Sequence, residues 1–274
     1  MLAPSQPGVW RQTRGRRNAR HVLLLIALLL GLAGPAQGET ASPSLTDAWL
    51  QLLAHSDRPI AWGHAFALRK ETARDLPRHQ TRLVGELDSL VLSARLQGER
   101  ASAETLSAWQ TALALQAGAP LRTPGRLDLP WLGAQLRPDP PLDKLDSWGF
   151  CTVPEWVEVW HHTGVVRLPV RAGESLRELL QRLPEDAWRR ADHARVISAT
   201  GQIQRVGVAA WNREPAMAGP GGRVLLELPE PARAPLPFAS RQTGTVTLAW
   251  LHDQLAEVLA GQLPGDDCEV LRQP

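Results

Sequence analysis

Apolar residues recur at steps of three and four in several stretches of the chain, which is the pattern of helices with one buried face. The first stretch predicts a short amphipathic helix over Leu45–Leu53, in which Leu45, Trp49, Leu52 and Leu53 share a face. Two further stretches predict a helical hairpin over about residues 78–118, with a tight turn at residues 98–101.

The ends of the hairpin helices are predicted from residues that start or stop helices. Pro77 is expected near the start of the first helix and Gly98 near its end. The second helix is expected to begin near Ser102, whose hydroxyl would cap it, and to stop at Gly118 and Pro120.

After residue 120 the pattern changes to that of strands. A strand is predicted within residues 121–136, and a hairpin of two strands is predicted to turn at Thr163-Gly164. A helix over residues 174–183 follows, then a second hairpin about Thr200-Gly201, and then a strand over residues 223–228. Two hairpins with one helix across them form a β-grasp, so the expected class is α+β with a β-grasp domain over residues 151–229.

A last helix is predicted over residues 245–261, after a Pro-rich linker at 230–244 and before a polar tail at 262–274. Its apolar stripe consists of Leu248, Leu251, Leu255, Val258 and Leu259. The stripe either packs against the rest of the molecule or docks on a partner. Few basic residues accompany it, which argues against binding to an anionic bilayer.

The N-terminus reads as a Sec-type signal peptide, and this changes the meaning of the composition. Of the 274 residues, the first 38 hold five Arg and no acid, and an apolar run and small residues follow the arginines. We expect cleavage after Gly38 and a periplasmic product; an uncleaved anchor is the alternative. The remaining residues carry 25 basic and 28 acidic side chains. This balance argues against nucleic acid as a partner, and the mature chain has no second apolar stretch of membrane-spanning length.

Export would place both cysteines of the chain, Cys151 and Cys268, in an oxidising compartment. They form a possible disulfide between the middle of the chain and its tail. Two unpaired thiols are the alternative, and the sequence does not decide between them.

Several short segments, in order, resemble the GfcC family of capsule biosynthesis proteins. The stretches that carry the resemblance are Gly164-Val-Val-Arg-Leu-Pro169, Ser175-Leu-Arg-Glu-Leu-Leu180, Val208-Ala-Ala-Trp-Asn-Arg213 and Gly221-Gly-Arg-Val-Leu-Leu-Glu-Leu228. Upstream, the helical hairpin and Gly125-Arg126-Leu127-Asp128-Leu129-Pro130 are similar to the family's helical insertion and the strand after it.

The resemblance implies two β-grasp (ubiquitin-like) domains and a terminal amphipathic helix in a non-enzymatic periplasmic protein. The first domain would span residues 39–150, where little chain precedes Trp62, so its opening hairpin is expected to be missing or reduced. Such proteins are encoded with capsule and exopolysaccharide export systems and resemble the SLBB ligand-binding modules of outer-membrane exporters. The implied partners are surface polysaccharide, an outer-membrane polysaccharide export protein, or both.

The sequence contains no arrangement typical of a catalytic or metal site. His55, Ser56 and Asp57 are consecutive, so their side chains are not expected to converge as a hydrolase triad. His161 and His162 are neighbours on a predicted strand and would point to opposite faces. We therefore predict no enzyme, no metal and no cofactor. A polysaccharide-modifying enzyme and a soluble-ligand module unrelated to export remain the alternatives.

Tryptophan is the main aromatic residue, with eleven Trp against three Phe and no Tyr. Indoles suit the apolar faces of sugar rings, and Arg and Asn suit their hydroxyl and carboxylate groups. The alternative is that most Trp side chains fill the core. For Arg126 the alternative is a structural ion pair with Asp128. The candidate ligand-binding residues are Arg126, Trp131, Trp148, Trp211, Asn212 and Arg213.

Overall fold

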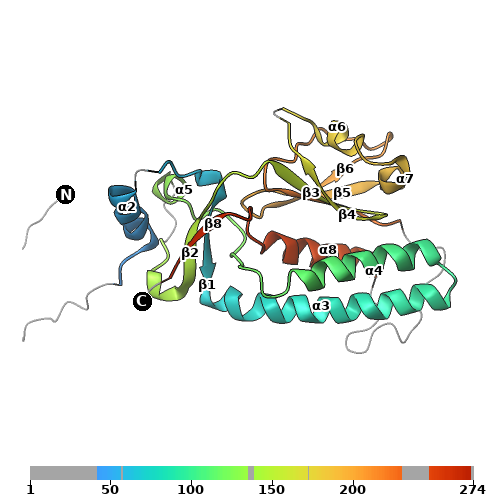
Figure 1. Cartoon of the computed structure of the whole chain (residues 1–274), viewed down its shortest axis with the longest axis horizontal. Helices are drawn as coiled ribbons and strands as arrows, with labels where there is room; N and C mark the ends of the chain where they lie inside the picture. Colours follow the sequence, from blue (N-terminus) through green and yellow to red (C-terminus); the bar gives the residue numbers. More distant parts are fainter. Residues whose placement is uncertain (1–41, 57, 135–138, 172, 230–246, 273–274) are drawn as a thin grey trace, which may run out of the picture. The chain divides into compact units, whose positions relative to one another are not determined.

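The computed structural model describes residues 42–56, 58–134, 139–171, 173–229 and 247–272. The predicted signal peptide at 1–38 and the predicted linker at 230–244 lie outside the described residues. Within them the chain is mixed α+β, as predicted, with two sheets (Figure 1). The elements in chain order are α2 (Leu45–His55), η1 (Trp62–His64), β1 (Ala65–Arg69), α3 (Lys70–Leu96), α4 (Arg100–Leu115), α5 (Leu129–Ala134), η2 (Leu142–Lys144), β2 (Leu145–Cys151), β3 (Trp156–His161), β4 (Gly164–Pro169), α6 (Leu176–Leu180), α7 (Glu185–Trp188), β5 (His193–Ile197), β6 (Ile203–Gly207), β7 (Arg223–Leu226), α8 (Leu248–Ala260) and β8 (Cys268–Leu271).

The larger sheet has five strands in the order β4-β3-β7-β5-β6. Its two hairpins, β3–β4 and β5–β6, are antiparallel, and β7 lies between them, parallel to β3 and antiparallel to β5. The second hairpin turns at Gly201, where φ is +81° and a side chain would be strained. This order is compatible with the β-grasp interpretation, because two hairpins are joined through a central fifth strand.

Helices lie on both faces of this sheet (Figure 1). One face packs against α6 and α7 through Leu176, Leu179 and Leu180, which are buried with Val157 and Val224. The other face packs against α8 and the α3–α4 hairpin. The sheet contributes Trp160, Ile197 and Leu225 to this core, and the helices contribute Trp109, Leu251 and Leu255. The helical hairpin and the terminal helix therefore share one core with the five-stranded sheet.

The smaller sheet has three strands in the order β1-β2-β8. Its core contains Trp49 of α2 and Trp148 of β2, whose ring centroids are 4.7 Å apart. Strand β8 belongs to the predicted polar tail, which instead pairs antiparallel with β2. Cys151 and Cys268 stand opposite each other in that pairing and form a disulfide. The tail thus completes a sheet whose other two strands lie more than a hundred residues earlier.

Some element predictions were wrong in detail. Residues 121–136 were predicted to hold a strand, but the described part has only an isolated bridge at Leu121 and the short helix α5. Helix α3 begins seven residues before Pro77, so this proline lies inside the helix beyond its first turn, where its missing N–H removes one hydrogen bond of the helix. Leu53, predicted on the buried face of α2, is 41% exposed.

Ser175 caps a helix in the structure, whereas Ser102, which was predicted to cap one, does not. Ser175 caps α6 with a complete capping box, in which its Oγ accepts from the Glu178 backbone N–H and its own N–H donates to the Glu178 carboxylate. Helix α4, in contrast, begins at Arg100, so Ser102 lies inside it and is not the cap that the sequence predicted. The glycine turn at Gly98, with φ of +77°, lets the helix begin earlier.

This difference gives a direct test by substitution. Ser175→Ala removes the acceptor for a helix N–H, so we expect it to lower the free energy of unfolding by about 1 kcal/mol. Ser102→Ala, the matched control, replaces a serine within a helix by the best helix former and is expected to change stability by less than about 0.5 kcal/mol. Urea unfolding of both variants measures the two values, and equal losses would contradict the assignment of the caps.

Candidate functional site

Residues 207–214, here called the Trp211 loop, form a tight turn after strand β6. The Val208 N–H donates to the Asp192 carbonyl at 2.9 Å, and the Glu214 N–H donates to the Gly207 carbonyl at 3.0 Å. Gly207 is required at this point, because a Cβ there would lie 1.9 Å from the Asn212 carbonyl oxygen. The backbone of the loop is therefore closed on itself and fixed to the sheet.

Asn212 holds the loop from inside. Its Nδ2 donates to the Asp192 carbonyl at 2.9 Å and lies 3.3 Å from Nε2 of His193. Because an amide NH₂ only donates, Nε2 of His193 acts as the acceptor and the ring proton sits on Nδ1. The His193 ring in turn stands perpendicular to the indole of Trp211, with centroids 6.5 Å apart. Asn212 is thus a positioning residue rather than a free ligand group.

Trp211 is held at the surface by these contacts. The side chain is 74% exposed, although Trp is usually among the more buried residue types. Arg213 and Met217, further along the same connection, are also exposed. The loop thus carries an exposed flat apolar ring and, two residues later, an exposed arginine, residue types suited to a sugar ring with hydroxyl or carboxylate groups.

Arg126, the first of the predicted ligand-binding residues, is an ion-pair partner in the structure. Its guanidinium binds both carboxylate oxygens of Asp128 at 2.8 Å, and this hydrogen bond raises the pKa of Arg126. Asp128 is 1% exposed and also accepts from the Trp131 N–H at 3.0 Å. Arg126 is therefore a structural ion-pair partner, which was the alternative to a ligand-binding role, because two of its donors compensate a buried carboxylate.

The other two predicted tryptophans are also engaged within the molecule. The Arg126 guanidinium lies over the ring of Trp131, 4.7 Å from the centroid, and covers it. Trp148 is 9% exposed and fills the core of the three-stranded sheet. Trp148 is therefore not free to stack on a ligand, and one face of the half-buried Trp131 is occupied by Arg126. Trp211 is the exposed indole of the predicted set.

The predicted docking stripe on the terminal helix is buried in the structure. Leu251, Leu255, Val258 and Leu259 are fully buried in the core between the five-stranded sheet and the helical hairpin, and Leu248 packs against the same core from its edge. The stripe therefore packs against the rest of the molecule and is not available for docking on a partner, because it already has an apolar partner surface within the chain.

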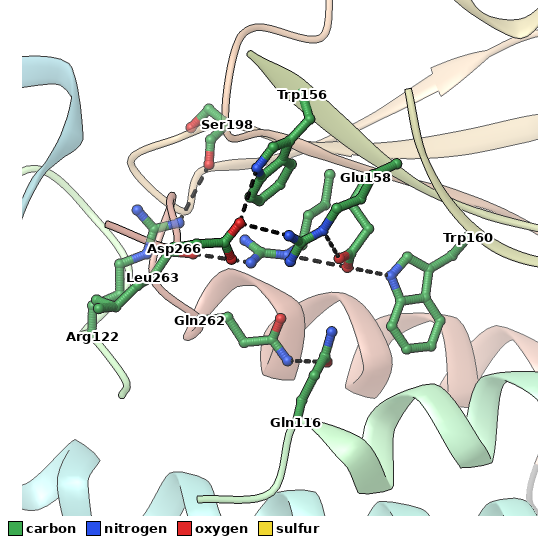
Figure 2. Close-up of polar contacts among 11 residues, drawn as sticks. Gln116, Arg122, Trp156, Glu158, Trp160, Ser198, Gln262, Leu263 and Asp266 are labelled. Atoms are coloured by element: carbon green, nitrogen blue, oxygen red, sulfur yellow. Dashed lines mark hydrogen bonds and ion pairs between the residues drawn. The ribbon is translucent and has the colours of Figure 1, made fainter. Parts of the chain in front are cut away.

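A cluster of three arginines, Arg122, Arg167 and Arg223, was not predicted from the sequence. It lies where the five-stranded sheet meets the end of α8 (Figure 2). Arg122 is 1% exposed and donates through Nε to the Ala260 carbonyl at 3.0 Å and through Nη1 to the Ala199 carbonyl. Burial and the charge of nearby Arg223 lower its pKa to about 9. The carbonyl end of α8 favours a positive charge, so Arg122 holds the helix end against the β5–β6 turn.

Arg223 extends this cluster toward the C-terminal strand. Its Nη2 donates to the Leu263 carbonyl at 2.9 Å, and its Nε lies 3.5 Å from the buried Glu158. Glu158 also accepts from Trp160 Nε1 at 2.9 Å and from Arg167.

Arg167 connects the same cluster to the tail. Its Nη1 donates to Asp266 at 2.7 Å, and its guanidinium lies over the Trp156 ring, 4.0 Å from the centroid. Trp156 Nε1 also donates to Asp266 at 3.2 Å. Figure 2 shows the indole nitrogen of Trp156 directed toward Asp266 and that of Trp160 directed toward Glu158. These contacts join α8, the tail and the sheet, although Nη1 of the buried Arg223 has no hydrogen-bond partner among the described residues. Trp211 lies outside this cluster and is the exposed candidate.

Neither a metal centre nor a membrane helix is found within the described ranges. Among residues 42–272, apart from the gaps stated above, no group of three or more His, Cys, Asp or Glu side chains converges to hold a metal ion. In the same part of the chain, no helix has the length and apolar character needed to cross a bilayer.

Comparison with known protein families agrees with the resemblance noted in the sequence. Residues 164–235 match the family model described as Capsule biosynthesis GfcC C-terminal. The chain is GfcC-like over this segment. The GfcC-like segment includes β4, α6, α7, the β5–β6 hairpin and β7, together with the Trp211 loop. No curated protein matches the chain in sequence.

Proposed function

We propose that this protein is a non-catalytic periplasmic component of capsule or exopolysaccharide assembly or export, and that it binds the polysaccharide through the Trp211 loop. The observation that carries the proposal is the 74% exposure of Trp211 on a fixed loop inside the GfcC-like segment. A rigid, exposed indole binds the apolar face of a sugar at little cost in conformational entropy. Arg213 on the same loop would add a contact with hydroxyl or carboxylate groups.

The periplasmic part of the proposal is supported by the disulfide. Cys151 and Cys268 pair across β2 and β8, and structural disulfides persist mainly in exported proteins. The predicted signal peptide agrees with this location. The loop, fixed to the five-stranded sheet, would present Trp211 to a polysaccharide on its path to the outer-membrane export protein.

The test is a calorimetric titration of the exported chain, residues 39–274, with the purified surface polysaccharide of the host. We expect saturable binding that Trp211→Ala weakens about tenfold, because an aromatic contact contributes about 1 kcal/mol beyond the area it buries. Trp211→Phe keeps a flat ring and should retain most of the affinity. Leu115→Ala, which removes an 82% exposed apolar side chain elsewhere, is the matched control and should bind like the wild type.

Two results would contradict the proposal. Unchanged binding by Trp211→Ala would remove the loop from the binding site. No binding by the folded wild type would remove polysaccharide recognition, and co-purification of an outer-membrane polysaccharide export protein would then identify a protein partner as the target. Melting curves of all variants, expected within about 0.5 kcal/mol of the wild type for exposed positions, show that folding is intact.

A further inference from the structure

A pocket of about 410 Å³ lies between the tip of the α3–α4 hairpin and the five-stranded sheet. Its walls come from α3, α4, the β3–β4 turn, α7, Leu228-Pro229 and the start of α8 at Leu248. The volume falls in the range of small-molecule sites, about 300–1,000 Å³, and exceeds the engineered cavities of about 150 Å³ that bind benzene. Space of this size is large enough for a ligand.

The inner wall of the pocket is aliphatic. Leu90, Ala94 and Leu106 are buried, and Leu228 and Leu248 are half-buried beside them. Among the described residues that line the pocket, the imidazole of His162 is the one aromatic ring. A ligand is therefore held by contact with methyl and methylene groups and not by ring stacking, which separates this pocket from the exposed indole of the Trp211 loop.

The charged side chains that line the pocket are mostly acidic. Glu99, Glu104 and Asp186 contribute carboxylates, whereas Arg190 is the one cationic side chain in the described lining. Arg100, outside the lining, pairs with Glu104 at 2.9 Å and compensates its charge, which leaves Glu99 and Asp186 as the acidic groups that face Arg190 across the lining. Like charges in a partly enclosed site repel each other, so this distribution disfavours an anionic ligand.

The neutral polar groups of the pocket are arranged near His162. Its Nε2 lies 3.2 Å from the Glu227 carbonyl and donates to it, and burial lowers the pKa of the ring. Thr105 donates to the His162 carbonyl from the side of the hairpin. These bonds fix the hairpin on the β3–β4 turn, so the shape of the pocket is set by the packing of the helices on the sheet.

From the aliphatic wall and the acidic rim together, we propose that this pocket binds a small aliphatic molecule whose polar end is uncharged or positively charged. The site shares no residue with the Trp211 loop and does not depend on the proposed binding of polysaccharide.

The test uses three eight-carbon probes that differ only in the polar end: octylamine, octan-1-ol and octanoate. Each is titrated into the exported chain and followed by the backbone amide NMR shifts of pocket residues. We expect saturable shifts with the amine and the alcohol, and an affinity for octanoate at least about threefold lower at low salt. Asp186→Asn should reduce the difference between amine and carboxylate, because it removes one of the acidic charges.

Two variants of α4 locate the binding. Ala101 is exposed and lines the pocket, so Ala101→Trp should fill the space and abolish the shifts. Ala114, exposed on the same helix outside the lining, is the control, and Ala114→Trp should bind as the wild type does. The absence of saturable shifts in the wild type, equal loss in both variants, or octanoate binding as tightly as octylamine would each overturn the proposal.

Discussion

Replacing both cysteines by alanine, Cys151→Ala with Cys268→Ala, is expected to lower the free energy of unfolding by about 4 kcal/mol. The disulfide closes a loop with a sequence separation of 117 residues, and in the chain-entropy model a long loop contributes the most. It also fixes β8 on β2, and the neighbouring tail residues Asp266 and Asp267 bind Arg167 and Thr152. Loss of the bond therefore weakens a contact between the tail and both sheets.

Urea unfolding of the oxidised wild type, the reduced wild type and the double variant measures this effect. The reduced wild type should fall close to the double variant, since both lack only the covalent bond. A variant within about 1 kcal/mol of the oxidised protein would show that the pairing of β8 holds the tail without the disulfide. The slope of the unfolding free energy with urea should rise, because the denatured chain without the cross-link is less compact and exposes more surface.

The long helices were predictable from the sequence because their period is local. Leu83, Leu87, Leu90 and Val91 repeat at helical spacing, and all of them are buried in the core of the structure. The β5–β6 hairpin was predictable for a similar reason, since Thr200-Gly201 supplies the positive φ that the turn needs. Periodicity and turn residues act within a few positions, so a single sequence carries both signals.

The tail was not predictable in the same way. Strand β8 is short, with the sequence Cys268-Glu-Val-Leu271, and it is formed only because β2 offers an edge with free backbone groups. The loss of a predicted strand within residues 121–136 has a related cause. The side chain of Arg122 binds the carbonyls of Ala199 and Ala260, which are 77 and 138 residues away in sequence, and these contacts hold the segment outside a sheet.

The candidate site was predictable by residue type but not by exposure. The abundance of Trp singled out Trp131, Trp148 and Trp211 together, yet only the structure separates the buried and covered rings from the exposed one. The loop around Trp211 contained one usable local signal. Gly207 and Asn212 are residue types that favour tight turns, and a turn places the side chain between them outward.

Acid is expected to destabilise the protein through His252 on α8. This side chain is 2% exposed, and its Nε2 accepts a hydrogen bond from the Leu228 N–H at 3.0 Å, so the folded state holds the ring neutral. Burial lowers its pKa from 6.5 to about 4, and the neighbouring Arg195 acts in the same direction against the opposing charges of Glu227 and Asp253. The unfolded chain therefore takes up a proton near pH 6.5, whereas the folded chain does so only near pH 4.

Stability from this group is complete above pH 6.5 and falls as the pH drops, by about 3 kcal/mol at pH 4. The expected result is that the free energy of unfolding of the wild type falls between pH 7 and pH 4, and that His252→Gln removes about 3 kcal/mol of that fall. Glutamine keeps an acceptor for the Leu228 N–H but does not titrate. Burial also lowers the pKa of His64, His161 and His162, so the variant retains part of the acid sensitivity. Parallel curves for the variant and the wild type would contradict a neutral, buried His252.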